Sequence, residues 1–416
     1  MNQVINFKWI GIYILLFLLI SCVPDIISVE NSINDKNFNI IYDNNTFENF
    51  EALDIKSTSD SGYIILGRYS NTSEDFRIQN ISYLLKVDAK GVFQWDTRQD
   101  KAFHAYREPV GELIVKGENY YFVCEKNFST TFVELNGRTK KITDRTKFDL
   151  ITRVERCVAT KDGGYLLLGG SSCLPSVGGG TSKNPSANIS LYKVNANYEI
   201  VWDRCFAKTP QYGIVQPDIE RYYNCGEFFD KGKSYTFCHA YYNDFYQPLF
   251  LDSLGKFLFE VEDSSYRFPY QINQIKEGLF FATFTDFRDI YFTQGFNILP
   301  ENKKATFNKP NIFHEIDPTQ KIFGIPAFIK GKDVFICGVG LRESIIGIYI
   351  INPKKEGGVL LGSTIIGNSR VYEYKSLCRS QDGGIMILAT TYVGNRFARI
   401  GIFKITKNNL ESLVPN

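Results

Sequence analysis

The sequence has few of the residues from which metal and catalytic sites are most often built. Three histidines, His104, His239 and His314, occur among 416 residues, and none stands at ligand spacing from a cysteine or another histidine. Neither sign of charge is in excess, because 47 lysines and arginines stand against 45 acidic residues and leave a formal net charge of +2. These shortages predict no metal site and no cofactor, and they argue against a nucleic-acid partner.

Long apolar runs are also missing, apart from Trp9–Ile20 near the amino terminus. As a helix this run would span about 18 Å, which is short of the ~30 Å hydrocarbon core but suits the apolar region of a signal peptide. Residues 19–22 (Leu-Ile-Ser-Cys) resemble the lipobox of bacterial lipoproteins. The resemblance implies a cleavable signal peptide over residues 1–21 and lipid on Cys22. An ordinary secretory signal and a short amino-terminal anchor are the alternatives.

The lipoprotein resemblance also implies a location. Such a protein is anchored in the cell envelope by two or three acyl chains, because one chain binds a membrane only weakly. Val23 differs from the Asp that retains enterobacterial lipoproteins at the inner membrane, which favours the outer membrane. Residues 22–37 are then expected to form a polar tether.

Internal repeats organise the rest of the chain. Three segments, Ser59–Ser70, Lys161–Ser172 and Gln381–Tyr392, each join an Asp-x-Gly turn to a run of apolar residues. Asp and Gly favour a tight turn with positive φ, and the apolar run is typical of a strand buried on both faces. Fainter copies occur at Tyr120–Cys124, Ser234–Cys238, Leu279–Thr283 and Asp333–Cys337.

A second phrase follows most copies and completes the repeat. In the first unit a strand and turn, Tyr83–Gly91, lead into a last strand, Val92–Arg98. Four antiparallel strands every ~50 residues, without helical periodicity, predict a single all-β propeller over residues 38–416, with seven four-stranded blades. The fifth unit, around Ile290–Ile298, matches least well. A β-solenoid or two sandwiches are the alternatives.

The repeats resemble the bacterial DGGY-type propellers and, more distantly, the quinoprotein-like and WD-repeat propellers. Trp95 and Trp202 stand at matching places in the last strands of units one and three. Quinoprotein propellers use such tryptophans to dock neighbouring blades. The resemblance therefore implies a packing role for both residues.

The two ends of the predicted propeller suggest how the ring closes. Phe38–Tyr42 is a strand without a nearby hairpin partner, and the seventh unit has only a doubtful fourth strand, Leu410–Val414. Pairing Phe38–Tyr42 into the blade that contains Ile385–Tyr392 would close the ring and remove an exposed edge.

The Asp-x-Gly turns also resemble the Asp-box of sialidases, as in Thr58, Asp60 and Gly62. Asp-boxes are structural turns even in sialidases, which in addition need an arginine triad. Residues 76–79 (Phe-Arg-Ile-Gln) come close to the arginine motif of that family, but no Tyr–Glu pair can be assigned. A sialidase-like glycosidase or lyase is therefore an alternative function.

Long loops between second and third strands share one face with the blade-to-blade links. The fourth unit adds an aromatic segment to this face, and its candidate binding residues are His239, Tyr241, Tyr242, Phe245 and Tyr246. Exposed aromatic side chains are a common binding surface, although packing between blades explains them equally well. We therefore expect a non-enzymatic scaffold for a protein or glycan ligand, or alternatively a component of an envelope assembly complex.

Two cysteines are expected to lie side by side. Asp230–Lys233 is typical of a hairpin with a two-residue tip, in which Gly232 supplies the positive φ. Such a turn places Cys225 opposite Cys238 on the same face of the sheet, within the Cα separation that a disulfide tolerates. We hypothesise a disulfide between them, unless a bulge near residues 228–229 shifts the register. The other cysteines of the repeats are interpreted as small buried residues.

Overall fold

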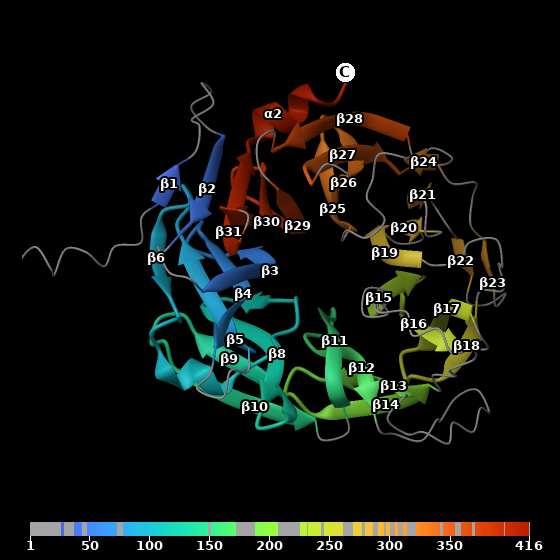
Figure 1. Cartoon of the computed structure of the whole chain (residues 1–416). Coiled ribbons are helices and arrows are strands. Elements are labelled where there is room, and N and C mark those ends of the chain that lie inside the picture. Colours follow the sequence, from blue (N-terminus) through green and yellow to red (C-terminus); the bar gives the residue numbers. More distant parts are fainter. Residues whose placement is uncertain are drawn as a thin grey trace, which may run out of the picture.

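The computed structural model describes residues 26–28, 37–43, 48–72, 78–148, 151–171, 188–206, 225–230, 232–242, 245–260, 269–276, 279–285, 290–294, 297–299, 304–306, 311–313, 322–341, 344–353, 359–367, 371–394 and 396–415. The predicted signal peptide and Cys22 lie outside these ranges. Within them, antiparallel sheets stand around a central axis, so the chain forms a single all-β propeller (Figure 1). No helix of the described residues is long and apolar enough to cross a membrane.

In most sheets four strands follow one another in chain order from the axis to the rim. The first two units are β3 (Asn49–Ser57), β4 (Tyr63–Thr72), β5 (Ile78–Val87) and β6 (Phe93–Asp96), then β7 (Ile114–Lys116), β8 (Asn119–Lys126), β9 (Ser129–Asn136) and β10 (Ile142–Phe148), with a short 3-10 helix, η1 (Lys101–Ala105), between them. The third and fourth are β11 (Ile151–Ala159), β12 (Tyr165–Ser171), β13 (Asn188–Val194) and β14 (Ile200–Phe206), then β15 (Cys225–Asp230), β16 (Lys233–Tyr242), β17 (Phe245–Asp252) and β18 (Phe257–Glu260).

The remaining units complete the ring. The fifth is β19 (Pro269–Lys276), β20 (Leu279–Thr285), β21 (Ile290–Gln294) and β24 (Asn311–Phe313), beside a separate pair, β22 (Asn297–Leu299) and β23 (Lys304–Thr306). The sixth is β25 (Ile322–Ile329), β26 (Lys332–Gly340), β27 (Ile346–Asn352) and β28 (Val359–Ile366). The last sheet has β29 (Tyr372–Arg379), β30 (Ile385–Val393) and β31 (Phe397–Ile405), to which β2 (Phe38–Tyr42) and β1 (Ile26–Ser28) are added.

Counting the sheets corrects the prediction of seven separate blades. The first two units are joined through Arg107, which bridges to Ile81 on one side and to Glu125 on the other. The backbones of Arg107 and Glu125 exchange hydrogen bonds of 2.7 Å in both directions. Among the described residues the ring therefore consists of six separate blade sheets, and the first of these is a double blade.

Successive residues of a second strand pack into different layers between sheets. In β4, Ile64 and Leu66 lie with Phe122 of the second unit, whereas Ile65 lies with Met386 of the last sheet. Both faces of the strand are therefore buried, which explains why the repeat carries an unbroken apolar run. Burying one such side chain contributes about 1.5–3 kcal/mol to folding.

The Asp-box-like turns share one geometry. In the first, the Thr58 hydroxyl and the Gly62 amide donate to one oxygen of Asp60, at 2.5 and 3.1 Å. Lys86, from the third strand of the same unit, lies 2.8 Å from the other Asp60 oxygen. The third turn repeats this arrangement with Ser380, Asp382, Gly384 and Lys404. The second has the same partners, Thr160, Asp162, Gly164 and Lys193, but its lysine contacts the same aspartate oxygen as the hydroxyl and the amide.

In each of these three Asp-box-like turns, called boxes below, the paired lysine is buried while the aspartate is half exposed. Lys86 exposes 3% of its side chain and Asp60 exposes 53%. A buried ammonium is costly unless it is paired, so the box holds the third strand as well as the turn. Burial raises the pKa of Asp60, but bonds from Lys86 and Thr58 outweigh this effect and bring it below the ordinary 3.8. The same holds for Asp162 and Asp382.

Acid is expected to remove the contribution of the three boxes together. A carboxyl whose pKa folding lowers stabilises the fold fully above its ordinary value, and loses that effect as the pH falls through the lower folded value. The thermal midpoint of the wild type should therefore exceed that of a triple Asp→Asn variant at positions 60, 162 and 382 at pH 6, and the gap should close below about pH 3.8. Calorimetry from pH 2 to 7 measures the gap. A gap independent of pH would contradict the role given to the boxes.

The amino-terminal strand lies where the sequence analysis placed it. β2 pairs antiparallel with β31, and Phe38 lies opposite Lys404. The Tyr42 hydroxyl also donates to the Gly91 carbonyl of the first unit at 2.6 Å. The predicted tether, residues 22–37, is partly structured, because β1 pairs in turn with β2.

A buried ion pair joins this end of the chain to the last sheet. Arg399 Nε donates to the Asp43 carboxylate at 2.7 Å, and Arg399 Nη1 donates to the Glu48 carbonyl at 2.7 Å. The Arg399 and Asp43 side chains expose only 2% and 7%. The pair therefore lies in the interior, beside the Phe50 and Phe397 rings.

The carboxyl terminus differs from the sequence prediction. In place of a strand over Leu410–Val414, the chain forms a helix, α2 (Lys407–Ser412), and β2 occupies the position of the fourth strand. Thr406 caps the helix, because its side-chain oxygen accepts a hydrogen bond from the Asn409 amide. Thr is among the residues preferred at this position. Leu410 and Val414 are buried against the last two sheets, so the apolar pattern reflects a helix face and not a strand.

The two tryptophans at matching places of the repeat pack between neighbouring blades. Trp202 Nε1 donates to the Ser253 carbonyl of the fourth unit at 3.1 Å. Gly255 lies so close to this ring that a Cβ there would come within 2.6 Å of it. The Trp95 ring lies 6.3 Å from the Tyr120 ring of the second unit. The packing role that the resemblance implied is confirmed.

Candidate functional site

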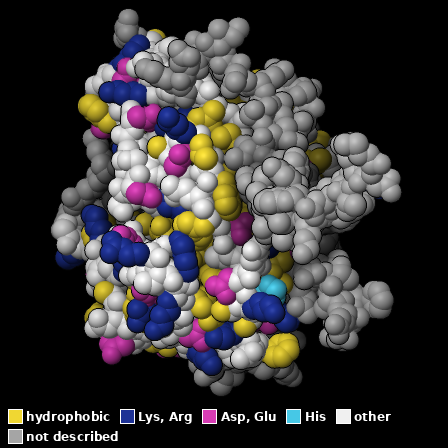
Figure 2. Space-filling model, turned by 90° about the vertical axis from the view of Figure 1, so that its left-hand side faces the viewer, with side chains coloured by type: hydrophobic (Ala, Val, Ile, Leu, Met, Phe, Trp, Pro, Cys, Tyr) yellow, Lys and Arg dark blue, Asp and Glu magenta, His cyan; other side chains and the backbone are white. Residues whose placement is uncertain are grey.

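The propeller has two faces that differ in their connections. The turn face carries the hairpins between first and second strands, at residues 58–62, 117–118, 160–164 and 380–384. The loop face carries the connections between second and third strands and the links between units. The outer side near β6 shows basic and acidic side chains interspersed, so charge of one sign does not gather there (Figure 2).

A charge cluster lies on the loop-face half of the axis, formed by Glu51, Arg68, Glu373 and Lys375. Glu51 accepts bonds from Arg68 at 2.8 Å and from Lys375 at 3.0 Å, and Lys375 also lies 3.0 Å from Glu373. Burial raises the pKa of Glu51, but Lys375 and Arg68 outweigh it and bring the net value below the ordinary one. Glu51 is thus held ionised and paired, which suits binding or support better than proton transfer.

Deeper in the ring, Asp54 connects three units. Its buried carboxylate accepts bonds from the Ser376 hydroxyl at 2.5 Å and the Leu113 amide at 2.9 Å, and lies 2.9 Å from Lys56 Nζ. Burial lowers the pKa of Lys56, but Asp54 and Glu112 outweigh it and raise the net value. This arrangement fixes the inner strands of the first, second and last units to one another.

Phe128 stands at the tip of the β8–β9 hairpin on the loop face, and its side chain is 93% exposed. Asn127 and Phe128 form the two-residue tip, with φ values of 51° and 61°. A two-residue hairpin tip of this kind, a type I′ turn, needs positive φ at both of its central residues. Asn-Gly suits such a turn, whereas a bulky residue is strained there. The fold therefore gains nothing from Phe at this place.

The predicted aromatic cluster also belongs to a loop-face hairpin. The backbones of β16 and β17 pair Tyr241 with Tyr246 and Tyr242 with Phe245, and His239 with Pro248. The predicted loop is thus, over residues 239–242 and 245–248, a continuation of the β16–β17 ladder. The side chains of the five candidate binding residues lie outside what the structure describes, as does Arg77 of the sialidase-like motif.

The cysteines are only partly as predicted. Cys225 lies opposite Cys238 in the ladder, as the predicted two-residue hairpin requires. Both are buried free thiols, however, so the hypothesised disulfide is not formed. Burial raises the pKa of both thiols, which keeps them protonated and unreactive. Cys205, for which no bond was predicted, is disulfide-bonded.

Two features of these sites were missed by sequence reasoning. The recurring Lys of the second phrase, Lys86 in the first unit, was visible but received no role. Asn127-Phe128 between two apolar strands was a turn signal with an unusual second residue. Within the described ranges, no group of three His, Cys, Asp or Glu side chains is placed to hold a metal ion.

Comparison with solved structures finds propellers of low similarity. The Dos1 propeller is 8% identical over 89% of this chain and 94% of its own, with a TM-score of 0.48. The propeller domain of the Trilobed protease from Pyrococcus furiosus is 9% identical over 86% and 95%, with a TM-score of 0.46. A virginiamycin B lyase from Staphylococcus aureus is 10% identical over 89% and 100%, also at 0.46. No protein-family model and no curated protein sequence matches the chain.

Proposed function

We propose that the chain is a lipid-anchored envelope protein whose propeller binds a protein or glycan ligand on its loop face without converting it. The exposed, strained Phe128 is the observation that carries this proposal. A bulky residue in the left-handed region costs about 1–3 kcal/mol, and such strain collects at functional sites. Two hairpins on the turn face have Gly at a tip position with positive φ, namely Gly232 and Gly331.

Two further observations support the proposal. The tip of the β16–β17 hairpin, which carries the aromatic candidate residues, shares the loop face with Phe128. The disulfide at Cys205 suits an oxidising compartment such as the cell envelope. We also propose that β2 closes the ring through its pairing with β31.

Replacing Phe128 with glycine is expected to stabilise the protein while removing ligand binding. Gly relieves the positive-φ strain, and about 0.5–1 kcal/mol of unfolding free energy should be gained, which urea unfolding measures. A photoreactive aromatic residue at position 128 should give a discrete adduct in intact cells.

Phe328 provides the matched control, because it is also exposed, at 68%, but lies in a strand with no positive φ. A photoreactive residue at position 328 should give no adduct. Equal labelling at both positions, or a loss of stability in the Phe128→Gly variant, would argue against Phe128 as a binding residue.

Lipid attachment is expected to require Cys22. The Cys22→Ser variant should remain an unprocessed precursor without acyl label, because the thiol is the acceptor in this class of protein. Metabolic labelling with a fatty acid and the mobility of the protein on a gel measure both effects. A variant that is cleaved and released normally would remove the basis for the anchor.

A further inference from the structure

Four acidic side chains of the described turn-face hairpins are already paired with cations that come from elsewhere in their units. These pairs are Asp60 with Lys86, Glu118 with Arg138, Asp162 with Lys193, and Asp382 with Lys404, at 2.7–2.9 Å. Three of these four cations are buried lysines of third strands, and the fourth is Arg138. The hairpins' own cations therefore have no carboxylate of the same turn left to neutralise them.

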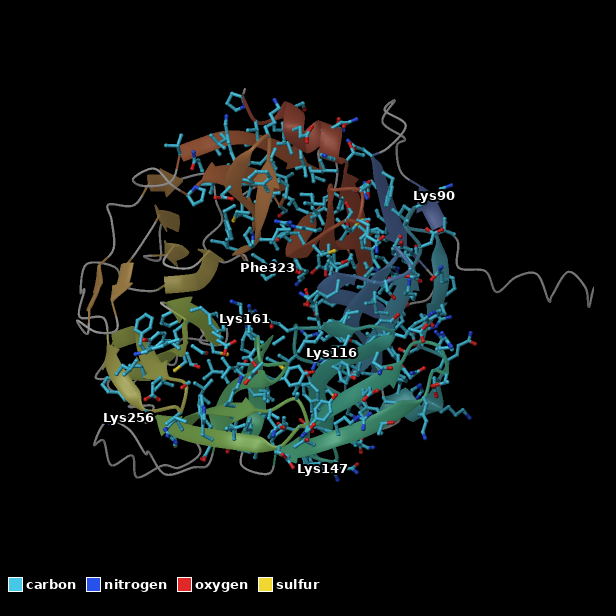
Figure 3. All side chains as sticks on the ribbon, turned by 180° about the vertical axis from the view of Figure 1, so that it is seen from behind. Lys90, Lys116, Lys147, Lys161, Lys256 and Phe323 are labelled. Carbon is cyan, nitrogen blue, oxygen red and sulfur yellow. The ribbon has the colours of Figure 1, made fainter. Side chains whose placement is uncertain are left out.

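Lys116 and Lys161 are two such cations close to the axis. Figure 3 shows both near the centre of the ring, together with Phe323, whereas Lys90, Lys147 and Lys256 lie on its outer rim. Among the described residues neither makes an ion pair with a carboxylate. Lys116 Nζ donates to the Gly163 carbonyl at 2.7 Å, and its charge lies 4.7 Å from the centre of the Tyr165 ring.

Lys161 and Arg379 extend the same pattern to two more hairpins. Lys161 Nζ lies 3.7 Å from the centre of the Phe229 ring, and its side chain is exposed. Arg379, at the end of β29, donates to the Pro326 carbonyl and is also exposed. Carbonyls and ring faces orient these cations without neutralising them. Three hairpins thus each present one charge that an anion can satisfy.

The remaining carboxylates near this end of the axis do not cancel the charge. Asp54 is paired with Lys56 at 2.9 Å, and Glu112 with Arg156 at 2.6 Å. Glu227 accepts bonds from the Lys161 amide and from the Ser234 hydroxyl, each at 2.7 Å, and is the one described carboxylate here without a cation. Of the described carboxylates named here, only Glu227 has no cation to pair with.

We propose that the turn-face end of the propeller axis binds a multivalent oxyanion, of the oligophosphate class, through Lys116, Lys161 and Arg379. Charge from three separate hairpins matches a ligand that carries several negative groups, and lysine suits phosphate as a point charge. Partial burial lowers the pKa of Lys116, so a bound anion also favours its charged form. The site lies on the face opposite to Phe128 and is independent of the proposed function.

The test is titration of the full-length protein in detergent with tripolyphosphate, followed by calorimetry. The Lys116→Gln/Lys161→Gln/Arg379→Gln variant should bind at least about tenfold more weakly, because it removes all three charges that would contact the anion. Affinity of the wild type should fall as salt is added. Binding should be unchanged in the Phe128→Gly variant, which separates this site from the loop-face proposal.

The matched control removes the same charge from exposed positions on the rim. The Lys90→Gln/Lys147→Gln/Lys256→Gln variant should bind within about twofold of the wild type, because distant exposed charges are screened. A Lys116→Arg/Lys161→Arg variant keeps the charge and should retain binding, which guards against a mere loss of folding. Equal weakening in the rim variant, or no wild-type binding at millimolar tripolyphosphate, would overturn the proposal.

Discussion

Replacement of Arg399 by alanine is expected to lower the free energy of unfolding by about 3–5 kcal/mol, because it removes the buried guanidinium that pairs with the buried Asp43 carboxylate. The same change removes the hydrogen bond that Arg399 donates to the Glu48 carbonyl. Since the pair joins the amino-terminal strand to the last sheet, the variant should also make residues 37–43 more accessible to protease. Urea unfolding and limited proteolysis of the purified protein measure the two effects.

Arg138 supplies the control, because its partner Glu118 and its own side chain are 51% and 77% exposed. The Arg138→Ala variant should lose no more than about 1 kcal/mol. A double variant, Arg399→Met with Asp43→Leu, should recover part of the loss, because it removes both charges together. If Arg399→Ala unfolds no more easily than Arg138→Ala, the buried pair does not secure the end of the chain, and the proposed ring closure fails with it.

Replacement of Asp54 by alanine is expected to cost a similar amount, about 3–5 kcal/mol, by a different route. It strands two buried donors from other units, the Ser376 hydroxyl and the Leu113 amide, and leaves Lys56 without its partner. The loss should appear as a lower urea midpoint for the whole transition, because three units share the carboxylate.

Asp88 is the matched control for Asp54. It also accepts two backbone bonds, from the Lys90 and Val92 amides at 2.8 Å, but in an exposed turn. Water replaces those bonds in the Asp88→Ala variant, so a loss of about 1 kcal/mol or less is expected. Equal losses in the two variants would mean that burial of Asp54 between units adds nothing.

Local patterns in the sequence predicted local structure well. One glycine, Gly232, was enough to place Cys225 opposite Cys238, because a two-residue hairpin fixes the register of the strands that it joins. The Asp-x-Gly phrases likewise placed three turns. Whether the opposed thiols form a bond depends on the surroundings that bury them, which a two-strand argument does not contain.

Contacts between distant segments could not be read in the same way. Arg107 joins two units into one sheet through backbone hydrogen bonds. Almost any residue type can make such bonds, so the sequence does not indicate this connection. Leu410–Val414 was misread because a short apolar pattern fits a strand or one face of a helix, and only the Thr406 cap distinguishes them. The cations of the proposed anion site were visible as residues, but only the structure shows that they lie on hairpins of one face.

The pairing of the first strand with the last sets the order in which the molecule can be completed. Asp43 and Arg399 are 356 residues apart, and at synthesis rates of roughly 5–20 residues per second the early strand waits roughly 20–70 s for its partner. During this time the sheets of the other units can form from contacts within each unit, whereas the pairing of β2 with β31 cannot form. The slowest productive step should therefore be docking of the two chain ends, and a chaperone that shields the free edge of β31 would act on that step alone.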